Sequence, residues 1–176
     1  LVSAYDDHFS AELNEAKLHQ GQQEVAQQMR ELLSGSQLIK KREAHLYKSV
    51  EEEFFKEKVQ EYYSLRCVPQ ILGPIKDTYQ NVLKVLLNEV NSANDNPIVD
   101  AEKQQVYHGG NFHGDYIALE MDKMRLATTK LSMLVERQLN YLMNAKLNDI
   151  FPPFLNHGKL GLNFGMQGAQ FSAVST

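Results

Sequence analysis

Three side chains near the middle of the chain, Gln60, Tyr63 and Arg66, are spaced three residues apart. On one helical turn this spacing places an amide, a phenol and a guanidinium on the same face. A guanidinium binds a carboxylate through two parallel hydrogen bonds, a geometry that a lysine cannot copy. The three residues could therefore bind a carboxylate. The same spacing also fits a solvated helix face, and spacing alone favours that second interpretation.

A second candidate is the polar stretch of residues 91–114, which separates the two most strongly helical segments of the sequence. Its Asn, Asp, Pro and Gly residues are turn formers, and long polar loops in compact chains are usually functional or disordered. Because the stretch also holds apolar residues such as Val106, we expect a functional loop pinned against a helical body, with Phe112 and His113 presented at its end. A surface connector with buried aromatic residues is the alternative.

Other kinds of site find little support in the sequence. The six histidines are scattered, and the close set of His108, His113 and Asp115 has no recognised metal-ligand spacing, so we expect no metal. A net charge of −4 gives no electrostatic support for nucleic-acid binding. No apolar run approaches the ~20 residues of a membrane span. The single cysteine, Cys67, excludes an internal disulfide and fits a reducing compartment, so we expect a cytoplasmic protein.

The elements that must position these residues are predicted to be helices. Apolar residues recur at helical spacing, no alternating strand pattern is present, and 176 residues are enough for one domain with a core. We therefore expect an all-α, long-helix bundle. The predicted helices cover residues 1–14, 19–35, 59–68, 69–90 and 115–148, and a last one begins near residue 166. The charge-dense residues 36–58 keep no clean apolar period and are expected to be solvated or mobile.

The predicted helix over residues 115–148 contains neither glycine nor proline. At ~1.5 Å per residue it would be roughly 50 Å long, which is typical of a bundle or an oligomer spine. The shorter helix before Pro69 is expected to end there, because the residue that precedes a proline disfavours the α conformation. Since the sequence starts without a methionine and stops inside an apolar segment, we expect it to be a piece of a longer protein.

Four segments of the chain resemble, in order and spacing, motifs of the aromatic amino acid ammonia-lyases, the family of the histidine, tyrosine and phenylalanine ammonia-lyases and related aminomutases. Residues 59–70 (VQEYYSLRCVPQ) are similar to the family segment QDxYSLRxxPQ. The other matching segments are residues 91–97 (NSANDNP), 109–114 (GGNFHG), and 151–155 (FPPFL) followed by 161–165 (GLNFG). The resemblance covers essentially all 176 residues, and the motif sequences most resemble those of the bacterial histidine and tyrosine enzymes.

The resemblance implies an enzyme that eliminates ammonia from an aromatic amino acid to give an α,β-unsaturated acid. Histidine or tyrosine is the expected substrate. The removed β-hydrogen is not acidic, so the family uses an electrophile, a methylidene-imidazolone (MIO) formed from its own Ala-Ser-Gly. By the motif match, Arg66 holds the substrate carboxylate and Gln60 hydrogen-bonds nearby. Tyr63 lies beside the electrophile and the amino group, and Phe112 packs against the electrophile and shapes the ring pocket. Family members form homotetramers whose active sites draw on more than one subunit.

The sequence also departs from the family pattern. It contains no Ala-Ser-Gly, since residues 33–35 (LSG) have the wrong first residue and the wrong place. The segment that carries the family's base tyrosine is absent, and Glu61 stands where the usual motif has an aspartate. We therefore expect residues 1–176 to be a single helical fragment from the centre of such an enzyme, inactive by itself. An aminomutase of the same family and a catalytically silent helical oligomerisation module are the alternatives.

Overall fold

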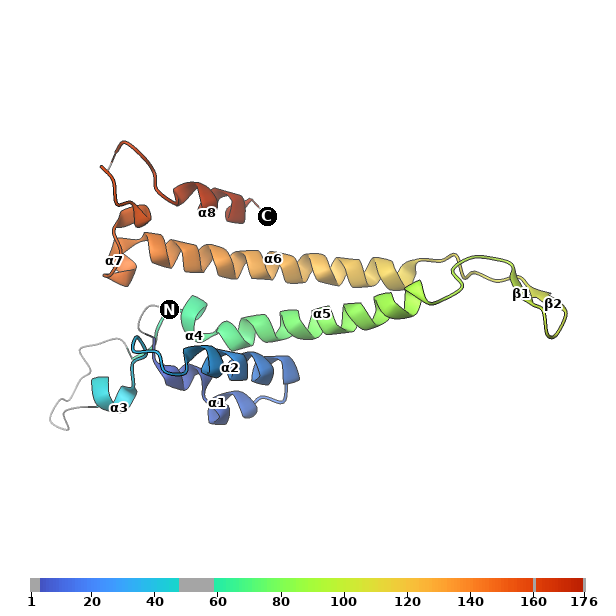
Figure 1. Ribbon diagram of the computed structural model, residues 1–176, viewed down its shortest axis with the longest axis horizontal. Coiled ribbons are helices and arrows are strands. Elements are labelled where there is room, and N and C mark those ends of the chain that lie inside the picture. Colours follow the sequence, from blue (N-terminus) through green and yellow to red (C-terminus); the bar gives the residue numbers. More distant parts are fainter. Residues whose placement is uncertain (1–3, 48–58, 160, 176) are drawn as a thin grey trace.

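The computed structural model describes residues 4–47, 59–159 and 161–175. This part of the chain is helical apart from one small two-stranded sheet, which confirms the predicted all-α fold. Its centre is an antiparallel pair of long helices, α5 (Val68–Val90) and α6 (Asp115–Met143). The helix α2 (Gln20–Leu33) packs on α5, and α8 (Gln167–Val174) packs on α6, so four helices lie in the order α2, α5, α6, α8 (Figure 1). Among the described helices, none is both long and apolar enough to cross a membrane.

Two glycines allow α2 and α5 to cross in backbone contact. A Cβ atom built on Gly73 would lie 2.6 Å from the backbone nitrogen of Gln22, and one on Gly21 would lie 2.4 Å from the carbonyl oxygen of Gly73. Both distances are far below an ordinary carbon contact, so only glycine fits at this crossing. The core beside the crossing consists of apolar residues from the N-terminal segment, α2 and α5: Phe9, Met29 and Leu33 with Val25, Val68 and Leu72.

The predicted single helix over residues 1–14 is wrong. Residues 1–3 lie outside the described part, and the others form a 3-10 helix, η1 (Asp6–Phe9), and a five-residue helix, α1 (Ala11–Glu15). Ser10 separates the two in a non-helical conformation, and its hydroxyl accepts the backbone N–H of Leu13 at 3.3 Å. A serine in this position caps the start of a new helix, and the apolar stripe along the sequence hid that break.

The predicted helix over residues 59–68 is also wrong in its boundaries. The structure has a helix of four residues, α4 (Tyr63–Arg66), and α5 then begins at Val68, so Pro69 lies in the first turn of α5 and does not end the helix before it. Backbone N–H groups in a first turn have no intrahelical partner, so a proline costs nothing there. Pro74 lies inside α5.

The predicted helix over residues 115–148 breaks at Asn144, which leaves α6 with 29 residues and a length of ~44 Å. A short helix, α7 (Ala145–Asn148), follows the break. The buried side chain of Asn148 holds this corner together, because its amide nitrogen donates and its oxygen accepts at once. It donates to the carbonyls of Tyr141, Leu142 and Asn144 and accepts from the amides of Ile150 and Phe151. A proline-led 3-10 helix, η2 (Pro153–Leu155), then leads toward α8.

The loop between the long helices contains a β-hairpin that the sequence did not predict. Strands β1 (Ile98–Asp100) and β2 (Gln105–Tyr107) pair in antiparallel register, and the hairpin extends past the far end of the α5–α6 pair (Figure 1). Val99, Val106 and Phe112 are 69%, 53% and 63% exposed. The expectation of a loop pinned against the helices is therefore wrong for this chain, because these apolar side chains are mostly exposed and the hairpin extends beyond the helices.

The charge-dense segment is described only in part. Residues 36–47 include the helix α3 (Arg42–His45), and Lys40 forms an isolated β-bridge with Tyr5. Residues 48–58 lie outside the described residues, so the mobility expected for the segment stays a prediction.

Candidate active site

The helix α4 is the element that carries Tyr63 and Arg66. Four residues are too few to form a stable helix alone, so tertiary contacts must hold α4 in place. Leu65 is buried, and the side-chain amide of Gln138 on α6 donates to the carbonyl of Ser64 at 2.9 Å. The hydrogen bond holds α4 against the last turns of α6, and the burial of Leu65 adds apolar stabilisation.

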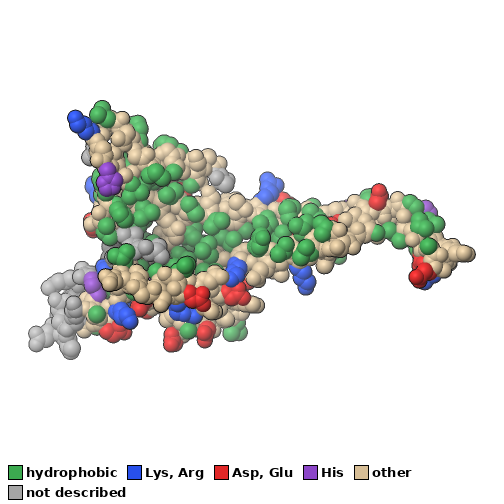
Figure 2. Space-filling model, viewed as in Figure 1, with side chains coloured by type: hydrophobic (Ala, Val, Ile, Leu, Met, Phe, Trp, Pro, Cys, Tyr) green, Lys and Arg blue, Asp and Glu red, His purple; other side chains and the backbone are tan. Residues whose placement is uncertain are grey.

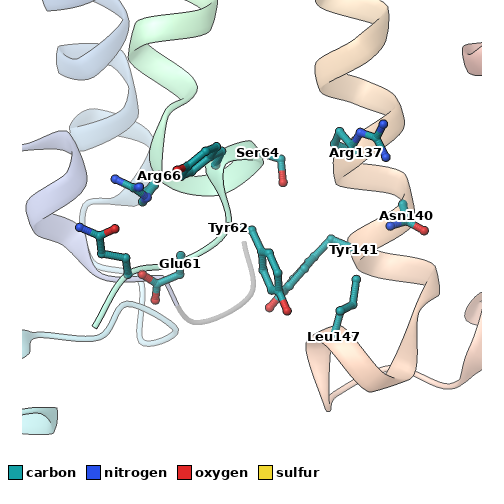
Figure 3. Close-up of a pocket in the computed structure, with 10 residues that line it drawn as sticks. Glu61, Tyr62, Ser64, Arg66, Arg137, Asn140, Tyr141 and Leu147 are labelled. Carbon is teal, nitrogen blue, oxygen red and sulfur yellow. The ribbon is translucent and has the colours of Figure 1, made fainter. Parts of the chain in front are cut away.

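A cavity of about 570 Å³ lies between α4 with its preceding residues and the C-terminal end of α6 (Figure 3). One wall is formed by residues 60–64 and Arg66. The opposite wall is formed by residues of α6 and α7: Arg137, Asn140, Tyr141 and Leu147. Between the walls the rings of Tyr62 and Tyr141 lie 5.5 Å apart at 59° (Figure 3). The cavity is of the size that small-molecule sites usually have.

Arg66 has an unsatisfied hydrogen-bond donor beside this cavity. Its Nε atom is buried and has no hydrogen-bond partner among the described residues, while its guanidinium carbon lies 4.6 Å from the centre of the Tyr63 ring. A buried donor without a partner costs free energy, about 1–3 kcal/mol and more for a charged group. A carboxylate would satisfy this donor and neutralise the guanidinium in the same step. The arrangement therefore suits an anionic ligand.

The structure brings together three of the four residues that the sequence singled out. Gln60, Tyr63 and Arg66 all line the cavity, with Tyr63 and Arg66 at the two ends of α4. The expectation that all three share one helical face is wrong, because Gln60 precedes α4 in a bend. Its place at the cavity is therefore not a result of helical periodicity.

Phe112, the fourth residue, lies far from the cavity within one chain. It precedes the start of α6, whereas Arg137 lies 22 residues into that helix, a separation of ~33 Å along the axis. Its ring is 63% exposed and lies 6.2 Å from the ring of His113, whose Nδ1 is 3.0 Å from an Asp115 carboxylate oxygen.

Several lining residues were missed from the sequence. Arg137, Asn140 and Tyr141 are spaced three and four apart, so they share a face of α6, but the same spacing occurs along the whole helix and did not mark them. Arg137 is held by an adjacent charge, since its Nε lies 3.2 Å from Glu136 Oε2. In the described residues, no group of three or more His, Cys, Asp or Glu side chains is placed to hold a metal ion.

A largely helical scaffold thus places an arginine, whose buried Nε has no partner among the described residues, beside the phenol rings of a cavity, and this arrangement suits an anionic ligand. The family model described as "aromatic amino acid lyase" matches residues 1–176, and the chain belongs to that family. This confirms the family assignment made from the four sequence motifs.

Individual relatives agree with the family match. A tyrosine 2,3-aminomutase of Chondromyces crocatus is 40% identical over 166 residues, which are 90% of this chain and 31% of that protein. A histidine ammonia-lyase of Caldanaerobacter subterraneus is 37% identical over 175 residues, 99% of this chain and 31% of that protein. An MIO-dependent tyrosine 2,3-aminomutase of Streptomyces globisporus is 39% identical over 167 residues, 91% of this chain and 31% of its own length.

A solved structure shares the fold. The crystal structure of tyrosine aminomutase from Streptomyces globisporus superposes with a TM-score of 0.86 at 38% identity, covering 99% of this chain and 34% of that chain. The chain thus spans about a third of the length of the relatives that it matches.

Proposed function

We propose that the complete protein containing this chain is an ammonia-lyase that eliminates ammonia from an aromatic amino acid, histidine or tyrosine, to give an α,β-unsaturated acid. The single observation that carries this proposal is the unsatisfied Nε of Arg66 beside the cavity. Family membership supplies the reaction class, and Arg66 supplies the reason why the substrate is a carboxylate.

The residues of this chain have distinct roles in the proposal. Arg66 binds the substrate carboxylate with two parallel hydrogen bonds and so fixes the orientation of the α- and β-carbons. The guanidinium is held against the Tyr63 ring, which limits its rotation before substrate binds. The Tyr63 hydroxyl lies beside the substrate amino group, and the Gln60 amide hydrogen-bonds nearby.

The family's electrophile comes from outside this chain, because the sequence contains no Ala-Ser-Gly. The MIO group would supply the electrophilic centre that makes removal of the non-acidic β-hydrogen feasible. The residues here fit that arrangement, since the cavity offers a guanidinium that can donate to a carboxylate, an amide and a phenol. The chain by itself is therefore expected to be inactive.

The proposal includes a homo-oligomer, a tetramer by resemblance to the family. Apolar side chains gather along α5 and α6 on the face shown in Figure 2, and Leu87, Val90, Leu119 and Leu126 are each more than half exposed. An apolar surface of that extent is typical of a surface covered by a partner. A second copy would cover it, and a neighbouring copy would bring Phe112 to a site that its own chain cannot reach. Light scattering on the complete protein tests this assembly, and a stable monomer would contradict it.

The aminomutase is the second candidate, and a specific observation favours it. Relatives named tyrosine 2,3-aminomutase are as similar to this chain as those named histidine ammonia-lyase, at 40% and 37% identity. Both reactions require that the substrate carboxylate be bound, so a carboxylate-binding role of Arg66 is compatible with either enzyme. They differ only in whether ammonia leaves or returns to the β-carbon.

Product analysis on the complete protein separates the candidates. Purified protein is incubated with tyrosine, histidine and phenylalanine in turn, and the products are resolved by chromatography and mass spectrometry. Unsaturated acid with an equal amount of ammonia is the expected result, and an accumulating β-amino acid would assign the aminomutase. If none of the three amino acids is consumed, the proposed function is wrong and a silent helical oligomerisation module becomes the better description.

A further inference from the structure

Residues 59–61, which carry Gln60 to the cavity, have no regular structure of their own. They form a bend before α4, and within the described residues no backbone–backbone hydrogen bond holds them. Gln60 is exposed, so its own burial does not fix it. The direction of the Gln60 side chain must therefore depend on the contacts of its two neighbours, Val59 and Glu61.

Glu61 is held by a histidine from the N-terminal segment. His8 Nε2 lies 2.8 Å from Glu61 Oε2, and because an ionised carboxylate only accepts hydrogen bonds, the ring N–H is the donor. His8 is 6% exposed and the Glu61 side chain 16%, so water competes poorly for this contact. The two residues are 53 positions apart in the sequence.

Val59 is held by an arginine from α3. Arg42 Nη1 donates to the Val59 carbonyl at 2.5 Å, and Arg42 Nε donates to Asp7 at 2.5 Å. The guanidinium also lies over the Tyr5 ring, with 4.3 Å between its carbon and the ring centre. The hydrogen bond to Asp7 raises the pKa of Arg42, so this donor stays charged. Asp7 and the Tyr5 ring thus hold the Arg42 guanidinium in place for its hydrogen bond to the Val59 carbonyl.

We propose that His8 and Arg42 are positioning residues of the candidate active site: by holding Glu61 and Val59 they fix the backbone on both sides of Gln60 and direct its amide to the cavity. Neither residue lines the cavity, so both act through residues 59–61, which carry Gln60, and not on the substrate. The kinetic part of this inference rests on the proposed function, whereas the anchoring of residues 59–61 does not.

The test uses the complete protein and His8→Leu, which removes the donor and replaces the imidazole with an apolar side chain of similar bulk. Amide hydrogen exchange over residues 59–66 should become at least tenfold faster, and kcat/KM should fall about fivefold to thirtyfold. His8→Gln, whose amide can donate to Glu61, should restore both quantities to within about threefold of the wild type. If His8→Leu fails to fold, Arg42→Lys replaces it, because a lysine cannot serve Asp7 and the Val59 carbonyl together.

A double-mutant cycle separates positioning from a general loss of structure. If His8 acts through Gln60, His8→Leu should lower kcat/KM by less than twofold in a Gln60→Leu background, since the group that it positions is already gone. The control is Gln22→Leu, which removes a buried side chain that donates to Asn14 in the same N-terminal core and, among the described residues, makes no hydrogen bond to residues 59–61. It should lower thermal stability and leave both the exchange of residues 59–66 and kcat/KM unchanged.

Two results would overturn the inference: unchanged exchange over residues 59–66 in His8→Leu, or an equal fall in kcat/KM with and without Gln60. An inactive wild type would instead overturn the proposed function, and the exchange measurement would still decide whether His8 anchors the segment.

Discussion

Replacing Arg66 by lysine in the complete protein should separate charge from geometry at the candidate site. Lysine keeps the positive charge but presents one ammonium group in place of the planar fork. Arg66 Nε is buried and has no partner within the part of the chain that the structure describes, so it is free to make the second of two parallel hydrogen bonds, which a lysine lacks. A hydrogen bond to a charged group contributes about 1.5–3 kcal/mol, which corresponds to roughly tenfold to a hundredfold in rate.

The assay is steady-state kinetics that follows the absorbance of the unsaturated acid. Arg66→Lys should lower kcat/KM by about tenfold to a hundredfold, because the carboxylate is less firmly oriented in the transition state. Arg137→Lys is the matched control, since Arg137 lines the opposite wall, is 70% exposed and is already paired with Glu136. It should change kcat/KM by less than threefold. If Arg66→Lys has no effect, or if the two variants lose the same activity, Arg66 does not bind the substrate carboxylate.

Three further predictions concern the site and the scaffold. Tyr63→Phe should lower kcat more than it changes KM in the same assay, because its hydroxyl is proposed to act beside the amino group; a change in KM alone would assign it to binding. Gly73→Ala should destabilise the protein by about 2 kcal/mol or more in thermal unfolding, since the new Cβ meets the backbone of Gln22. Gly168→Ala is its control, because a Cβ there meets nothing within 4 Å and should leave stability equal or raise it by up to ~1 kcal/mol. Limited proteolysis should cut residues 36–58 first, and a first cut within α6 would contradict the predicted mobility of that segment.

The sequence predicted the elements that have strong periodicity and few interruptions. The apolar face of α2, the length of α5 and most of α6 follow from helical spacing, and the start of α8 was placed within one residue. The boundaries failed where one side chain decides the local conformation. Ser10 starts a helix inside an apolar stripe, and Asn148 closes the end of α6 by bonding five backbone groups. Neither residue changes the periodicity of its segment.

The candidate site was predictable only as a set of residue types. Tyr63 and Arg66 share α4 as their spacing indicated, but Gln60 lies outside that helix, and its neighbours Val59 and Glu61 are contacted by residues 17 and 53 positions away. Such long-range contacts leave no local pattern in the sequence. Phe112 was assigned by motif alone, and the structure of one chain places it at the opposite end of α6. In the proposed assembly Phe112 would reach the site of a neighbouring copy, a contact that a single sequence does not describe.

The central claim is that Arg66 of this chain binds the carboxylate of an aromatic amino acid. The most direct measurement is a crystal structure of the complete protein with the unsaturated acid bound. The ligand carboxylate should accept two hydrogen bonds from Arg66, from Nε and a terminal nitrogen, each at about 2.8 Å. A bound acid whose carboxylate lies against Arg137 or in solvent, with Arg66 Nε still without a partner, would contradict it.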